Sequence, residues 1–123
     1  YDAFNRQDME AFLDLLHEDV IHDINQGGRQ VGKQAFRDFM AHMNRSYRET
    51  LTDIVIMSND DGTRGAAEFT VNGQYLATDE GLPEANGQTY VLPAGAFFDI
   101  RDGKVARITN TYNLNDWIAQ VGA

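Results

Sequence analysis

Residues 87–114, GQTYVLPAGAFFDIRDGKVARITNTYNL, decide the fold that the sequence predicts. They contain two runs rich in β-branched and aromatic residues, at 87–100 and 104–114, joined by the turn sequence RDG. Two such runs around a short glycine-containing turn are typical of a β-hairpin. Upstream, LTDIVIMS at 51–58 and GAAEFTVNGQYLA at 65–77 repeat the pattern around the turn NDDG. We therefore predict antiparallel strands throughout the second half of the chain.

Helical patterns dominate the first half. Apolar residues recur every three or four positions from Phe36 onward, which predicts an amphipathic helix over 33–45. Asp8 fits the N-cap of a shorter helix, and His17 with its acidic neighbours is expected at that helix's end. Residues 20–24 read as a short strand between the two helices.

A last short helix is expected after an N-cap at Asn115, with Trp117 facing the core. Helices followed by antiparallel strands predict an α+β fold in which the helices cover one face of a curved sheet. No linker or repeat interrupts the chain, so we expect a single domain over 1–123.

Composition excludes several classes of partner and site. The 10 Lys and Arg stand against 19 Asp and Glu, a formal net charge of −9, which disfavours nucleic acid and anionic membrane surfaces as partners. There is no cysteine, so a disulfide framework and a thiolate zinc site are excluded. No apolar run approaches the roughly 20 residues that span a bilayer, and we expect a cytoplasmic protein. Adjacent strand residues diverge, so His22 and Asp23 predict no metal site.

The polar pair His22 and Asp23 ends a strand that should be buried. One interpretation is that the pair lines a pocket, where desolvation displaces the pKa of a carboxylate or imidazole and suits it to proton transfer. The other is that the pair caps the following turn with Asn25 and Gln26 through bonds to the backbone. The sequence leaves both open.

The order of elements and three segments resemble the nuclear-transport-factor-2-like superfamily, specifically its ketosteroid isomerase-related and SnoaL-like members. The segments are AFNRQDMEAFLDLLHEDVIHD at 3–23, VGKQAFRDFM at 31–40 and GQTYVLPAGAFFDIRDGKVARITNTYNLNDW at 87–117. The resemblance implies a cone-shaped fold, with a curved mixed or antiparallel sheet covered by N-terminal helices around an internal pocket. It does not fix the reaction, because this fold carries isomerases, dehydratases, cyclases and plain binding modules.

In ketosteroid isomerase a carboxylate base ends the first strand, and a Tyr and a protonated Asp bind the enolate oxygen. By resemblance Asp23 lies beside the position of that base. Either Asp23 is shifted into the cavity, or the alternation of the strand points His22 inward instead. Gly95 stands where the protonated Asp would be, and Met40 where a supporting Tyr would be, so the steroid isomerase reaction itself is not predicted.

Asn110 and Tyr112 share one face of the last strand with Ile108, and by resemblance that face looks into the cone. An amide and a phenol there could hydrogen-bond a substrate carbonyl. The alternative is a core tyrosine and an asparagine that satisfies a neighbouring strand or a dimer contact. Apolar and aromatic side chains are expected to form the core or the wall of the pocket: Met40, Met43, Tyr47, Phe69, Val71, Tyr75, Phe97, Ile108 and Trp117.

These features predict a cofactor-independent enzyme that acts on a small, largely apolar carbonyl compound as an isomerase, cyclase or dehydratase. Asp23 or His22 would be the base, with Asn110 and Tyr112 as donors to the oxyanion. The alternative is a non-catalytic dimeric module that binds an apolar metabolite or a partner protein. In either case we expect a homodimer through the exposed face of the sheet, because members of the resembled superfamily pair in this way and TDIVIM is apolar on both faces.

Overall fold

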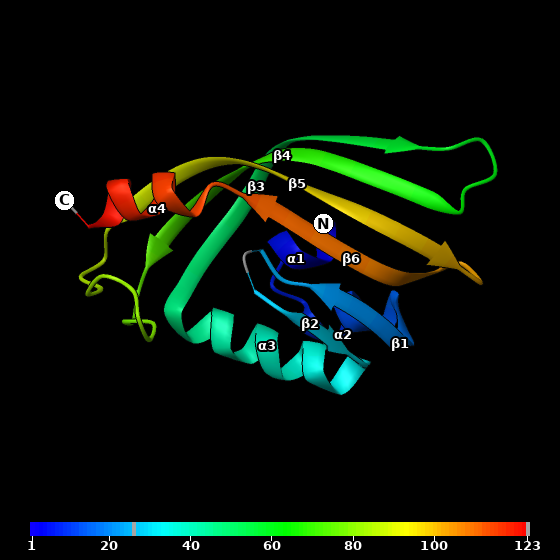
Figure 1. Ribbon diagram of the computed structural model, residues 1–123, viewed down its shortest axis with the longest axis horizontal. Coiled ribbons are helices and arrows are strands. Elements are labelled where there is room, and N and C mark those ends of the chain that lie inside the picture. The colour runs from blue at the N-terminus through cyan, green and yellow to red at the C-terminus, as the bar shows by residue number, and fades with distance from the viewer. Residues whose placement is uncertain (26, 123) are drawn as a thin grey trace.

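The computed structural model describes residues 1–25 and 27–122. Within these residues a six-stranded curved sheet has the strand order β2-β1-β6-β5-β4-β3 (Figure 1). The strands are β1 (Leu16–Asp23), β2 (Arg29–Val31), β3 (Tyr47–Ser58), β4 (Arg64–Tyr75), β5 (Thr89–Arg101) and β6 (Lys104–Tyr112). β1 runs parallel to β6, and the other pairs are antiparallel. The predicted α+β class is confirmed.

The β5–β6 hairpin forms around the predicted RDG turn. Arg101 pairs with Lys104, and the two residues between them, Asp102 and Gly103, have φ angles of 56° and 73°. A two-residue hairpin with positive φ at both positions matches the right-handed twist of the strands. In β3 the register shifts between Thr52 and Val55, and an irregularity of this kind bends a strand.

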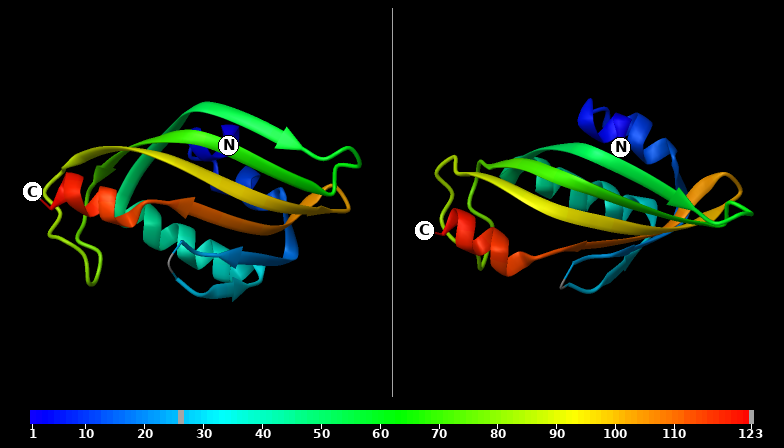
Figure 2. Two further views of the ribbon diagram at one scale, coloured as in Figure 1. Left: turned by 45° about the horizontal axis from the view of Figure 1, so that its top comes forward. Right: turned by 90° about the horizontal axis from the view of Figure 1, so that it is seen from above.

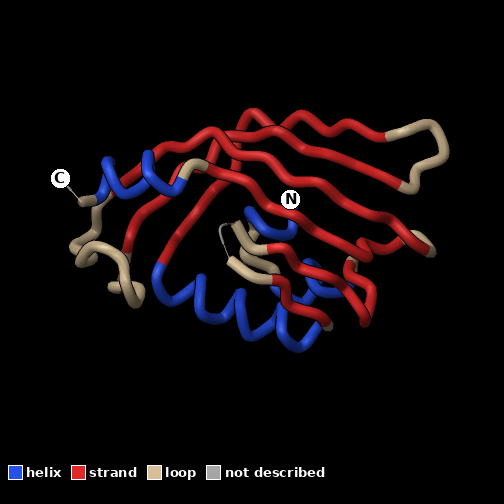
Figure 3. The backbone as a smooth tube through the Cα atoms, viewed as in Figure 1, coloured by secondary structure: helices blue, strands red, loops and turns tan. Residues whose placement is uncertain are grey.

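The helices are α1 (Asp2–Asn5), α2 (Met9–Asp14), α3 (Lys33–Ser46) and α4 (Leu114–Val121). Figure 2 shows the sheet curling over α3, and in Figure 3 the strands form one continuous curved layer beside the helices. The prediction of α3 is confirmed almost to the residue. Asp8 caps α2 as predicted, because its side chain accepts a bond from the Ala11 N–H at 3.1 Å.

Two helix boundaries differ from the sequence prediction. α2 ends at Asp14, and His17 lies inside β1 instead of at a helix end, because Leu16 already pairs with Val105 of β6. The cap of α4 is Asn113, whose side chain accepts from the Asp116 N–H at 3.1 Å, so the prediction of Asn115 as the cap was wrong. Both asparagines fit the cap pattern, and the end of β6 decides between them.

Two groups of buried side chains form the core between the sheet and the helices. One surrounds Val20, Phe36 and Met40, where β1 meets α3. The other surrounds Tyr75, Tyr90 and Trp117 and lies under α4. The concave face of the sheet therefore has a β1–α3 end and an α4 end, and both carry polar side chains among apolar ones. Among the described residues, no helix combines the length and the apolar character needed to cross a membrane.

Candidate functional site

His22 is a buried polar side chain at the β1–α3 end of the concave face. It is 2% exposed, and its ring stacks on Phe36 with centroids 4.4 Å apart and meets Phe39 edge-on at 4.7 Å. Nε2 lies 3.3 Å from the amide nitrogen of Asn110, while Nδ1 is buried and has no hydrogen-bond partner among the described residues. Burial lowers the pKa of His22, and the charge of Asp23 opposes this shift. A neutral imidazole in such a place can accept or donate a proton.

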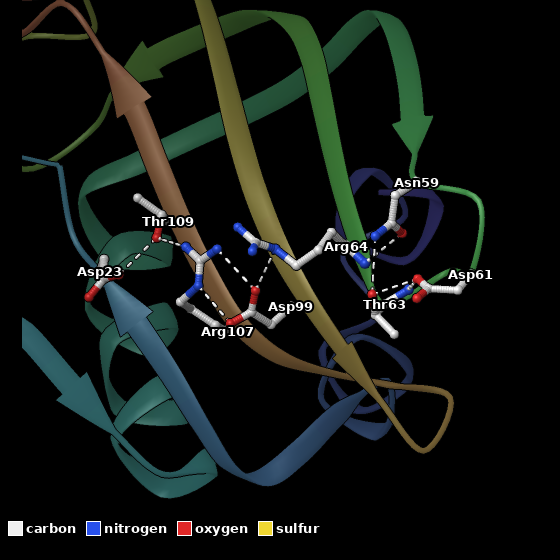
Figure 4. A network of polar contacts seen from close by, with 8 residues as sticks. All are labelled: Asp23, Asn59, Asp61, Thr63, Arg64, Asp99, Arg107 and Thr109. Atoms are coloured by element: carbon white, nitrogen blue, oxygen red, sulfur yellow. Dashed lines mark hydrogen bonds and ion pairs between the residues drawn. The ribbon is translucent and has the colours of Figure 1, made fainter.

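Asp23 lies on the opposite, convex face, because successive side chains of a strand alternate. Its carboxylate accepts bonds from Arg29 Nε at 2.6 Å, Arg29 Nη2 at 3.1 Å and the Thr109 hydroxyl at 2.8 Å. These bonds lower the pKa of Asp23 to about 2. Figure 4 shows it at one end of a polar network that continues through Thr109 and Arg107 to Asp99. A carboxylate stabilised in its charged form is a weak proton acceptor.

Asn110 and Tyr112 share the concave face with His22. Asn110 pairs with Ala96 of β5, and its amide contacts the imidazole. Tyr112 is 38% exposed, and its backbone N–H donates to the side-chain oxygen of Asn25 at 3.2 Å. Burial raises the pKa of the Tyr112 hydroxyl. The structure thus brings His22, Asn110 and Tyr112 to one face and leaves Asp23 on the other.

Glu49 is a polar residue of the concave face that sequence analysis missed. It lies in β3 and is partly buried, and its Oε2 accepts a bond from the Tyr90 hydroxyl at 2.6 Å. Burial raises the pKa of the Glu49 carboxyl, against the effect of that bond. The same burial raises the pKa of Tyr90. The signal was present in the sequence, because Tyr47, Glu49 and Leu51 alternate with exposed residues, and this period places a carboxylate on the inward face.

A second acidic group, Asp79, comes from the loop between β4 and β5. It accepts from the Tyr47 hydroxyl at 2.8 Å and lies 2.9 Å from His42 Nε2. The Asp79 N–H donates to the hydroxyl of Tyr75 at 2.9 Å, and that hydroxyl donates to the carbonyl of Pro83. These bonds hold the loop against the start of β3, beside the α4 end of the concave face.

Most of the predicted wall residues gather in the two core groups. Met40 is buried and Met43 is half-buried on α3, while the sheet and α4 contribute Tyr47, Phe69, Val71, Tyr75, Ile108 and Trp117. Phe97 is not brought to this face. It is 50% exposed on the convex side, where it pairs with Thr109, since the inward residues of β5 are Leu92, Ala94, Ala96 and Phe98. No three His, Asp or Glu side chains of the described segments come together as metal ligands.

Comparison with known proteins relates most of the chain to one family. A family model described as a SnoaL-like domain matches residues 1–108. A candidate polyketide cyclase from Pseudomonas putida KT2440 is 73% identical, with a TM-score of 0.97 over 98% of this chain and 91% of that one. A candidate polyketide cyclase from Xanthomonas campestris pv. campestris is 62% identical, with a TM-score of 0.95 over 98% and 89%.

More distant structures share only the fold. An NTF2-like protein of unknown function from Burkholderia pseudomallei K96243 is 18% identical and has a TM-score of 0.76 over 100% of this chain and 92% of that one. The search among curated proteins finds no match. The predicted superfamily is confirmed by the family model and by these neighbours together.

Proposed function

The chain belongs to the SnoaL-like domain family, and from this premise we propose that it is a cofactor-independent enzyme that cyclises or isomerises a small, largely apolar carbonyl compound by acid–base catalysis. The observation that carries the proposal is the state of His22. Its imidazole is buried against two phenylalanine rings, its pKa is lowered, and one ring nitrogen has no partner within the described residues. A neutral, oriented imidazole can remove a proton next to a carbonyl.

Asn110 sets the tautomer of this base. The structure places the amide nitrogen of Asn110 at Nε2, and a 180° turn of that amide puts its oxygen there instead. In the turned orientation the oxygen accepts a hydrogen bond from the Nε2 proton, and the imidazole carries a lone pair on Nδ1. Nδ1 then takes the α-proton of the substrate, and the electron pair left behind moves onto the carbonyl oxygen as an enolate. Tyr112 lies next along the same face of β6 and is partly exposed, so its hydroxyl can donate to that oxygen. In this assignment His22, and not Asp23, is the base.

Ring closure is the favoured outcome because two solved structures with 73% and 62% sequence identity to this chain are described as candidate polyketide cyclases. An enolate formed at one carbon attacks a second carbonyl of the same molecule, and His22 returns the proton to the new alkoxide. No redox step is needed in this sequence. An isomerase would use the same enolate and return the proton to a different carbon.

The test is α-proton exchange of 2-tetralone, an apolar aromatic ketone, in D₂O, followed by NMR. The wild-type protein should accelerate the exchange, and His22→Gln should lower the rate by about 10²- to 10⁴-fold. Tyr112→Phe should lower it by on the order of 10²-fold. His17→Gln is the matched control, since His17 lies in the same strand away from this face and should keep the full rate.

The competing function, a non-catalytic dimeric module, gives a different result. It binds 2-tetralone without accelerating exchange, and His22→Gln then changes only the affinity. Exchange that is equally fast in the wild-type and His22→Gln proteins would refute the assignment of the base.

A further inference from the structure

At the α4 end of the concave face, Glu49 and Tyr90 form a hydrogen-bonded pair that depends on the residues around it. Tyr90 of β5 pairs with Gly73 of β4, and Gly73 pairs with Glu49 of β3. The tyrosine ring lies across Gly73, where a Cβ would overlap it, and so its hydroxyl reaches the carboxylate two strands away at 2.6 Å. Trp117 of α4 meets the Tyr90 ring edge-on at 5.9 Å.

The carboxylate is only partly compensated. Its recorded hydrogen bond comes from a neutral phenol, and no Lys, Arg or His among the described residues forms an ion pair with it. Taking a charged carboxylate out of water without a cation is costly, and a core that needed only packing would use an apolar residue at this position. One carboxylate oxygen, Oε1, has no hydrogen bond within the described part of the chain.

Tyr112 connects this pair to the proposed catalytic end. Burial is the main cause of the raised pKa of the Tyr112 hydroxyl, and the Glu49 charge adds to it. Both residues face the concave side of the sheet, Tyr112 from β6 and Glu49 from β3. Glu49 is half-buried, and Tyr112 is 38% exposed. A ligand that extends along the concave face from Tyr112 therefore has Glu49 as a second polar group on that face.

Resting on the proposed function, we propose that Glu49 and Tyr90 form a second subsite, which binds a hydroxyl group of the substrate. The carboxylate accepts the bond from an enol or phenol hydroxyl through Oε1, while Tyr90 keeps Oε2 in place. The substrate class is therefore an apolar, ring-forming compound that carries a carbonyl at one end and an enolic or phenolic hydroxyl at the other.

The test compares two ligands that differ by one hydroxyl. 2-Naphthol has a single hydroxyl, and 2,6-dihydroxynaphthalene has one at each end of the same apolar body. We expect the wild-type protein to bind the diol roughly tenfold more tightly in calorimetric titrations, since a hydrogen bond to a charged group contributes this much or more. The double variant Glu49→Leu/Tyr90→Phe removes both polar partners together and should lose this preference while its affinity for 2-naphthol stays within about threefold.

Glu68→Leu is the matched control. Glu68 lies on the neighbouring strand β4, is exposed and faces the convex side, so this variant should keep the full preference for the diol. If the double variant does not fold, Glu49→Gln keeps an acceptor for Tyr90 and should still reduce the preference at least threefold, because the charge is lost.

A wild-type protein that binds both ligands equally, or neither, overturns the inference, and so does a double variant that keeps the preference. These outcomes are separate from the failure of the proposed function. That failure would appear as absent or His22-independent proton exchange, whichever naphthol binds better.

Discussion

Gly73→Ala should be destabilising only because of Tyr90. A methyl group at position 73 would overlap the tyrosine ring, which is 2% exposed and held between the sheet and Trp117. The ring has no room to move without breaking its bond to Glu49, and overpacking of this kind costs about 1–3 kcal/mol. Alanine in a strand is otherwise better than glycine by about 0.5–1 kcal/mol. The overlap term is therefore about 1–3 kcal/mol, and the net cost of Gly73→Ala is about 0–2.5 kcal/mol once the alanine gain is subtracted.

A double-mutant cycle with Tyr90→Leu isolates this term. Leucine does not reach across position 73, so Gly73→Ala in the Tyr90→Leu background should be neutral or stabilising by up to about 1 kcal/mol. The loss of the donor to Glu49 is common to both members of that background and cancels. Urea denaturation followed by Trp117 fluorescence measures all four proteins. Costs for Gly73→Ala that agree within about 0.5 kcal/mol in the two backgrounds would refute the reasoning.

Three further predictions concern the rest of the molecule. Asp23 has a folded-state pKa of about 2, below its ordinary 3.8. The charged carboxylate should therefore stabilise the fold by about 1 kcal/mol, after discounting for solvent screening, above pH 4, and this stabilisation should be lost as the pH falls to 2. Asp23→Asn should remove this part of the acid sensitivity. On the convex face the side chains of Phe97, Met57 and Val91 are each about half exposed, and this apolar surface should pair two copies of the chain. Light scattering should then give a mass of twice 13.8 kDa at micromolar concentration. Phe97→Asp should give a monomer. Asn113→Ala should cost about 1 kcal/mol in chemical denaturation, whereas Asn115→Ala should cost much less.

The fold was predictable because its signals are local and repeated. The hairpin turns, the alternation of strands and the helical spacing over 33–45 each act within a few residues, and all agreed with one topology. The boundary at β1 was not predictable in the same way. The acidic stretch around His17 fits a helix end as well as a strand, and pairing of Leu16 with Val105, almost ninety positions away, decides it. Long-range pairing of this kind leaves no mark in a single sequence.

The candidate site was also only partly predictable from the sequence. Sequence reasoning identified the concave face of β6 and the polar pair that ends β1, but it could not choose between His22 and Asp23, because a shift of one residue in a strand exchanges its two faces. Register with β6 makes the choice: His22 is opposite Ile108, an inward residue, and Asp23 is opposite Thr109, an outward one. Phe97 was assigned to the pocket wall for the same reason, but in the structure its neighbour Phe98 faces inward and Phe97 faces the convex side.

Glu49 was not predicted as a site residue, for a different reason. The resemblance places catalytic groups at the end of the first strand and on the last one, whereas the sequence of β3 stands out only by its apolar pattern. Yet the contact between Glu49 and Tyr90, whose ring lies across Gly73, involves three strands. These strands share no sequence motif. If the subsite binds a substrate hydroxyl, the polar groups of this protein are spaced along the sheet to hold both ends of one molecule. The identity of the substrate then depends on the distance between two polar subsites more than on either one alone, which is how one fold can serve many reactions.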